Sequence, residues 1–89
     1  MISHTTKRFR TAFQKLPKKI QVKAKKVYKI WKENPEYPSL WFKKVHSTKP
    51  IYSVRIDLDY RAIGIMTGDT VVWFWIGSHS DYNRLLKEI

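Results

Sequence analysis

Apolar side chains recur every three or four residues along the first third of the chain. Two segments carry this period, and their apolar positions are Phe9, Ala12, Phe13 and Leu16, then Ile20, Ala24, Val27, Tyr28 and Trp31. The period predicts two amphipathic helices. Thr5 or Thr6 can cap the first helix, and Pro17 suits the first turn of the second. Asn34-Pro35 ends the second helix, and the short link between the two predicts a helical hairpin.

The second half of the chain changes to the two-residue period of β-strands. Four segments predict strands, namely residues 40–45, 51–57, 60–67 and 71–76. Gly68-Asp69 fits a two-residue hairpin turn, so we expect an antiparallel meander. Within the second strand, Arg55 lies on the face opposite to that of Val54 and Ile56.

Residues 71–76 are apolar at every position, which predicts a central strand covered on both faces. Strict alternation divides them between the two faces, with Val71, Trp73 and Trp75 on one and Val72, Phe74 and Ile76 on the other. Ser78 can cap a final helix. The buried residues expected in this helix are Leu85, Leu86 and Ile89.

A length of 89 residues is that of one domain, so we expect residues 1–89 to form a single unit with a small core. The elements predict an α+β fold: an N-terminal helical hairpin packed on a small twisted antiparallel sheet of about four strands, then a short C-terminal helix. The absence of cysteine excludes disulfides and thiolate zinc sites. With no secretory signal and no apolar run long enough for a bilayer, we expect a soluble cytoplasmic protein.

The net charge of +11 falls almost entirely on the first half of the chain. Residues 1–50 hold fourteen Lys and Arg against two Glu, whereas residues 51–89 hold four against five acidic residues. Such a field favours a polyanion, namely RNA, DNA, an acidic membrane or an acidic protein, although a merely soluble lysine-rich surface has the same composition. Because so basic a chain repels itself and binds RNA indiscriminately, we expect an acidic protein partner that neutralises it.

Two arginines of the predicted sheet have the chemistry of a phosphate site. Arg55 and Arg61 flank one hairpin, so their guanidinium groups could meet on the open face of the sheet. Guanidinium pairs with phosphate oxygens and stays charged, which suits a phosphorane transition state. No phosphate-cradling glycine pattern is present, so we expect no small-molecule cofactor. Asp57, Asp59 and Asp81 stand where turns and helix starts favour aspartate, so we expect no metal site.

His79 and Tyr82 lie near the start of the last predicted helix. A neutral imidazole can accept a proton and, once protonated, donate it. The ring of Tyr82 could stack on a base, or its hydroxyl could donate to a phosphate. Each residue alone is as readily an exposed cap residue or an edge of the core, but with Arg55 and Arg61 they predict a catalytic set. The lysines expected to bind RNA are Lys25, Lys29, Lys43 and Lys44.

Seven short stretches along the chain carry a family resemblance. They are Leu16-Pro17, Asn34-Pro35, Phe42-Lys-Lys-Val, Pro50-Ile-Tyr-Ser-Val-Arg-Ile, Asp59-Tyr-Arg-Ala-Ile-Gly, Trp73-Phe-Trp-Ile-Gly-Ser-His and Asp81-Tyr-Asn-Arg-Leu-Leu. Over nearly the whole chain they resemble the RelE/ParE superfamily of toxins from bacterial type II toxin–antitoxin systems. The resemblance implies a RelE-like toxin domain over residues 1–89, neutralised by a cognate antitoxin in a heterocomplex.

The resemblance implies one of two activities. RelE-like members are metal-independent endoribonucleases that cut mRNA, generally in the ribosomal A site, where the ribose 2′-hydroxyl attacks the adjacent phosphorus. ParE-like members inhibit DNA gyrase and lack the catalytic set. We expect an mRNA endonuclease that acts on ribosome-bound mRNA and inhibits translation. The alternatives are a gyrase inhibitor and a non-catalytic basic domain that binds nucleic acid or an acidic protein.

The resemblance also assigns roles by position. Arg61 matches the strand arginine that stabilises the transition state, and Arg55 stands where a catalytic lysine is frequent. His79 and Tyr82 match the C-terminal acid and stacking residues of some members. Ser53 departs from the pattern, because a basic residue is expected there. We therefore interpret His79 as the general base and Tyr82 as a stacking residue.

Overall fold

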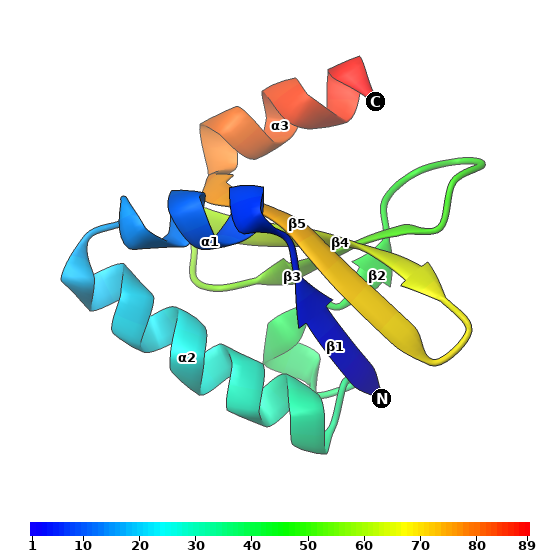
Figure 1. Ribbon diagram of the computed structural model, residues 1–89, viewed down its shortest axis with the longest axis horizontal. Helices are drawn as coiled ribbons and strands as arrows, with labels where there is room; N and C mark the ends of the chain where they lie inside the picture. The colour runs from blue at the N-terminus through cyan, green and yellow to red at the C-terminus, as the bar shows by residue number, and fades with distance from the viewer.

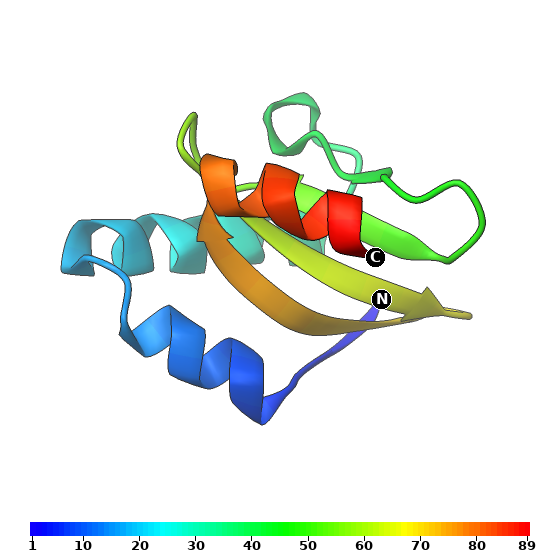
Figure 2. The same cartoon turned by 90° about the horizontal axis from the view of Figure 1, so that it is seen from above.

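The computed structural model describes residues 1–89 as three helices and a sheet (Figure 1). The elements in order are β1 (Ile2–Thr5), α1 (Lys7–Gln14), α2 (Lys18–Glu33), the 3₁₀ helix η1 (Pro38–Leu40), β2 (Lys43–Lys44), β3 (Ile51–Arg55), β4 (Tyr60–Thr67), β5 (Thr70–Ser78) and α3 (His79–Glu88). The strands form one sheet in the order β1-β5-β4-β3-β2. In Figure 1, α3 lies above the strands and α2 below them, and Figure 2 shows α3 running across the sheet. The α+β fold and both predicted helical regions are confirmed.

The helix boundaries follow the capping residues of the sequence. The Thr6 hydroxyl accepts a hydrogen bond from the backbone N–H of Phe9 and so begins α1. Pro17 precedes α2 as its capping residue, one position earlier than the first turn in which it was expected. The helix ends at Glu33, with Asn34 in an extended conformation before Pro35.

The sheet contains a strand that the periodicity did not predict. β1 pairs with β5 in parallel, and backbone bonds fix both of its ends: Ile2 N–H donates to the carbonyl of Asp69 (2.8 Å) and Thr6 N–H to that of Trp73 (3.0 Å). The sheet is therefore five-stranded and mixed, where four antiparallel strands were expected. As a result β4 is the middle strand, and the apolar segment 71–76 lies next to it.

The strand predicted over residues 40–45 is mostly absent. Pro38 begins the 3₁₀ helix η1, which ends at Leu40, and Trp41 follows with a left-handed backbone (φ 48°, ψ 42°). Only Lys43 and Lys44 pair with β3. The prediction was wrong because the chain turns at Pro38–Leu40 and buries Leu40 in the larger core, so the apolar residues here do not belong to one strand.

One extra residue in β5 changes which side chains share a face. Ile63 pairs with Trp75 and Gly64 with Trp73, so Phe74 has no partner of its own in β4. Trp73 and Ile76 consequently pack in one cluster, and Trp75 packs in the other. The strict alternation predicted for residues 71–76 was wrong for this reason, since a bulge reverses the order of faces.

The core has two parts, one on each face of the sheet. The larger part lies under α1 and α2, and its most completely buried residues are Trp31, Leu40 and Val71. The smaller part lies under α3 around Ile63 and Tyr82, with the predicted residues Leu85, Leu86 and Ile89 half-buried against it. None of the helices has the length and apolar character needed to cross a bilayer.

Replacing Gly64 by alanine tests the packing of β4 against β5. A Cβ atom there would lie 2.7 Å from Cγ1 of Val71 and 2.9 Å from Cε3 of Trp73. Because both neighbours are buried, we expect Gly64→Ala to lower the free energy of unfolding by about 1–3 kcal/mol in urea denaturation. Gly68→Asn is the control, since Gly68 has φ +62° in open space and asparagine tolerates this backbone. An unchanged unfolding midpoint for Gly64→Ala would contradict this packing.

Candidate functional site

The pairing of β3 with β4 brings two arginines together. Arg55 and Arg61 are direct partners in the antiparallel register, so their side chains leave the same face of the sheet. It is the face that α3 covers, because Ser53 and Ile63, two residues away on each strand, pack beneath that helix. Both arginines are partly exposed. The structure thus brings together the two arginines that the sequence analysis selected.

The turn between β3 and β4 anchors one of them. Arg61 Nη1 donates to the main-chain carbonyls of Asp57 and of Tyr60, the latter at 2.9 Å. The Asp57 carboxylate accepts from the N–H of Asp59 (2.8 Å) and lies 3.4 Å from Nζ of Lys23. Partial desolvation acts to raise the pKa of Asp57, but these two donors outweigh it, and the pKa lies below its ordinary value. The turn therefore holds the Arg61 guanidinium in one position.

The two guanidinium groups repel each other. Partial burial, followed by the charge of Arg55, lowers the pKa of Arg61 below its ordinary value. The ion pairs of the chain are Lys23–Asp57 and Arg84–Asp81, so neither arginine has a carboxylate partner. Arginine stays protonated at neutral pH, so two positive charges without an ion-pair partner share this face, and only the more distant carboxylates of Asp57 and Asp59 offset them. A bound phosphate would relieve that repulsion through paired hydrogen bonds.

Trp41 and Lys43 extend the arginine pair toward the edge of the sheet. The guanidinium carbon of Arg55 lies 4.9 Å from the ring centroid of Trp41, and Nζ of Lys43 lies 6.0 Å from the same ring. Lys43 pairs with Ser53, so its side chain leaves the same face as the two arginines. Lys44 pairs with Tyr52 and leaves the opposite face. Of the two predicted RNA-binding lysines of this strand, one joins the arginines.

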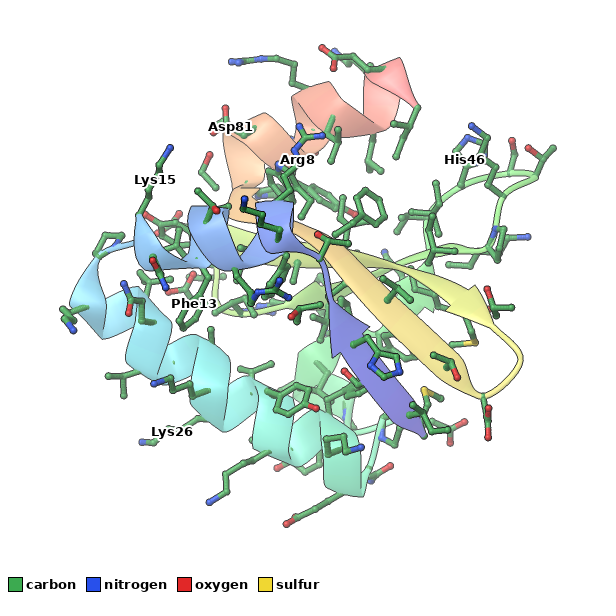
Figure 3. All side chains as sticks on the ribbon, in the orientation of Figure 1. Arg8, Phe13, Lys15, Lys26, His46 and Asp81 are labelled. Atoms are coloured by element: carbon green, nitrogen blue, oxygen red, sulfur yellow. The ribbon has the colours of Figure 1, made fainter.

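His79 is the first residue of α3, which follows the strand that pairs with Arg61. Ser78 caps the helix by accepting from Asp81 N–H (3.2 Å), and the N–H of His79 donates to the carbonyl of Asp59 (2.6 Å). Figure 3 shows Asp81 in this first turn. Because Gly77 pairs with Arg61, the helix begins two residues after the strand position opposite that arginine. The imidazole is exposed and available to a ligand.

Tyr82 lies below this surface. Its side chain is 8% exposed, its hydroxyl donates to Oγ of Ser53 (3.3 Å), and its ring packs with Ile63 and Ile51. Its ring centroid lies 5.8 Å from that of His79. A base has no free ring face to stack on here, so the geometry suits Tyr82 to support the histidine and the strand. Ser53, the departure from the family pattern, is its hydrogen-bond partner.

Lys25 and Lys29 belong to a second surface, on the other face of the sheet. They line an apolar groove of about 410 Å³ between α1, α2 and the strands. Phe13 points from α1 into this groove, whereas Lys26 projects from α2 away from it (Figure 3). Arg10 also lines the groove, so its apolar floor has a basic border. The structure does not bring these two lysines to the arginine pair.

Sequence reasoning missed Trp41 as a surface residue. It falls in the apolar segment predicted as a strand over residues 40–45, yet it is 56% exposed, whereas Trp31 and Trp73 are buried. A signal was present in Pro38-Ser-Leu, because a proline followed by a short polar residue is typical of a turn and not of a strand interior.

A family model described as ParE-like toxin domain matches residues 18–84 of the chain. No curated protein sequence matches it. Among solved structures, YafQ from E. coli has 14% sequence identity and a TM-score of 0.72, covering 90% of this chain and 94% of its own. The RelB–RelE antitoxin–toxin complex from Methanococcus jannaschii has 18% identity and a TM-score of 0.70, covering 92% and 96%. The YoeB/ParE toxin from Agrobacterium tumefaciens has 14% identity and a TM-score of 0.69, covering 89% and 99%. These likenesses show the fold.

Proposed function

This chain belongs to the family of ParE-like toxin domains, and on that premise we propose that it is the toxin of a toxin–antitoxin pair that cleaves mRNA without a metal ion. The observation that carries the proposal is the direct pairing of Arg55 with Arg61, with His79 exposed at the neighbouring helix start. This arrangement supplies two permanent cations and one proton acceptor on a single face. Those are the groups that phosphodiester cleavage needs when the nucleophile belongs to the RNA itself.

In the proposed reaction the 2′-hydroxyl of the ribose attacks the adjacent phosphorus. The His79 imidazole takes the proton of that hydroxyl as the new O2′–P bond forms. Arg55 and Arg61 hold the non-bridging oxygens, where negative charge grows in the transition state. The bond to the 5′-oxygen then breaks, and that oxygen leaves with a proton from solvent. The products are a 2′,3′-cyclic phosphate and a 5′-hydroxyl end.

Tyr82 has a positioning role in this proposal. Its ring lies beside the imidazole, and its hydroxyl ties α3 to β3 through Ser53. His46 fixes the other end of the same helix, because its Nε2 lies 2.7 Å from the carbonyl of Ile89. Restraint at both ends would limit the movement of His79 relative to the strands, and general acid–base catalysis needs such fixed positioning.

The alternative is inhibition of DNA gyrase, and the ParE-like description of the matching family favours it. That activity needs no proton acceptor beside the arginine pair. A supercoiling assay with purified gyrase separates the two proposals, because only the gyrase inhibitor blocks supercoiling while leaving mRNA intact.

Alanine substitution of Arg61 and of His79 tests the nuclease proposal. Loss of either the charge-stabilising group or the proton acceptor should lower the cleavage rate by about 10²-fold or more. The measurement is mapping of new mRNA 3′ ends after the protein is added to translating ribosomes, with thermal unfolding as a check of folding.

Matched controls exist for both residues. Arg84 is exposed on α3 and His4 is exposed on β1, so Arg84→Ala and His4→Ala should cleave like the unmodified protein. Message that stays intact in the presence of the unmodified protein would contradict the proposal. Full activity of both site variants would contradict the assignment of the residues.

We also propose an acidic antitoxin as the protein partner, and the apolar groove as the place where one of its segments docks. Only two ion pairs form among eighteen Lys and Arg residues, so most of the positive charge has no internal partner. The groove combines apolar lining with Arg10, Lys25 and Lys29 at its border. Apolar side chains flanked by carboxylates fit that surface in shape and charge. The similar toxin from M. jannaschii was solved bound to its antitoxin RelB.

Charge reversal at the groove tests the partner proposal. Lys25→Glu with Lys29→Glu should weaken binding of the proposed acidic antitoxin by about tenfold or more, and should flatten the salt dependence of binding. Titration calorimetry at two salt concentrations measures both effects. The control reverses Lys18 and Lys26, which are exposed on α2 but do not line the groove. Equal losses in the two double variants would place the antitoxin elsewhere.

A further inference from the structure

The mechanism proposed above leaves one exposed aromatic residue beside the arginine pair without a role. Trp41 is 56% exposed, and its indole lies against Arg55, which is the strand partner of Arg61. We propose that Trp41 is a stacking platform for one unpaired nucleobase, so that the site takes single-stranded RNA. This inference rests on the proposed function, because it places a base next to the phosphate held by the two arginines.

The backbone holds Trp41 in an unfavourable conformation. Its φ of 48° makes it the only non-glycine residue of the chain with a positive φ. A residue with a large side chain rarely adopts this region, and such strain is typical of binding sites. The conformation caps η1, with the N–H of Trp41 donating to the carbonyl of Pro38 (3.4 Å). A glycine would satisfy the same turn, so the turn does not explain the indole.

The residues on either side of Trp41 are fixed by packing. Leu40 is 1% exposed in the main core, and the ring of Phe42 packs against Trp31 (5.7 Å) and Tyr52 (5.2 Å). Because both neighbours point inward, the left-handed residue between them turns its side chain out to solvent. The indole is therefore presented by a rigid support, which lowers the entropy lost on binding.

The charges around the indole select an anion with an aromatic group. Arg55 lies at 4.9 Å from the ring centroid and Lys43 at 6.0 Å, so two cations border the same ring. A nucleotide carries its phosphate and its base in adjacent positions, and stacking needs only the flat face of the base. Duplex RNA hides those faces in its own stack, so the combination favours an unpaired strand.

The experiment uses a fluorescein-labelled single-stranded RNA in which every ribose is 2′-O-methylated, so that no cleavage occurs, together with an abasic oligonucleotide of the same length. Affinity is measured by anisotropy for the unmodified protein, Trp41→Gly, Trp41→Phe and Tyr37→Ala. Tyr37 is the matched control, since it is 47% exposed on the same loop but does not contact Arg55. Glycine accepts the backbone of position 41, so loss of function in Trp41→Gly is not loss of folding.

We expect Trp41→Gly to weaken binding of the methylated RNA by roughly tenfold or more, in line with the stacking of one base. Trp41→Phe should retain most of the affinity, Tyr37→Ala should retain all of it, and the abasic oligonucleotide should bind the unmodified protein and Trp41→Gly equally. The melting temperature of Trp41→Gly should be equal to or above that of the unmodified protein.

Three results would overturn the inference: unchanged RNA affinity in Trp41→Gly, an equal loss with the abasic oligonucleotide, or no binding of the methylated RNA by the unmodified protein. Failure of the proposed nuclease gives a different result. In that case the methylated RNA binds through Trp41, but natural mRNA stays intact.

Discussion

The register between β3 and β4 is the constraint on which the site depends. It places Arg55 opposite Arg61 on the face of α3. A slip of one residue in either strand would turn the arginine of that strand toward the larger core, where an unpaired charge is strongly unfavourable. The apolar side chains of the same strands prevent such a slip, because Val54 and Ala62 must stay beneath α1 and α2. The packing of the core therefore determines where two like charges meet.

The two faces of the sheet divide the chemistry of the molecule. The face under α3 carries the arginine pair, Lys43 and the helix start with His79. The other face carries the apolar groove with its basic border. An antitoxin segment in that groove would lie on the face opposite the proposed RNA site. To block that site directly, another part of the antitoxin would have to extend around the edge of the sheet. The bulge at Phe74 contributes to this division, since it puts Gly77 on the same face as Arg61.

Much of the fold could be predicted from the sequence because strong periodicity and clear capping residues agreed. The helix over residues 18–33 and the hairpin around Gly68 are of this kind. β1 could not be predicted, because it is held by main-chain bonds that four side chains of mixed polarity do not reveal. The bulge in β5 could not be predicted either. Residues 71–76 are apolar at every position, so they show no alternation that an extra residue would interrupt.

The site was predictable in part. The two-residue alternation of the strand predicted the face of Arg55, and the hairpin between the two strands predicted that Arg61 would lie near it. The burial of Tyr82 depends on the packing of α3 against β3, where the Tyr82 hydroxyl bonds to Ser53. The exposure of Trp41 depends on the left-handed backbone after Leu40. The lysines of α2 were assigned by charge alone, and charge does not tell which side of a sheet a helix will cover.

The joint action of the two arginines is the central claim, and a double-mutant cycle tests it most directly. Arg55→Gln, Arg61→Gln and the double variant are compared in their affinity for non-cleavable 2′-O-methylated RNA. If both groups hold one phosphate, the two losses should depart from additivity by about 0.5 kcal/mol or more. Losses that add within about 0.3 kcal/mol, or no loss in either single variant, would contradict the claim.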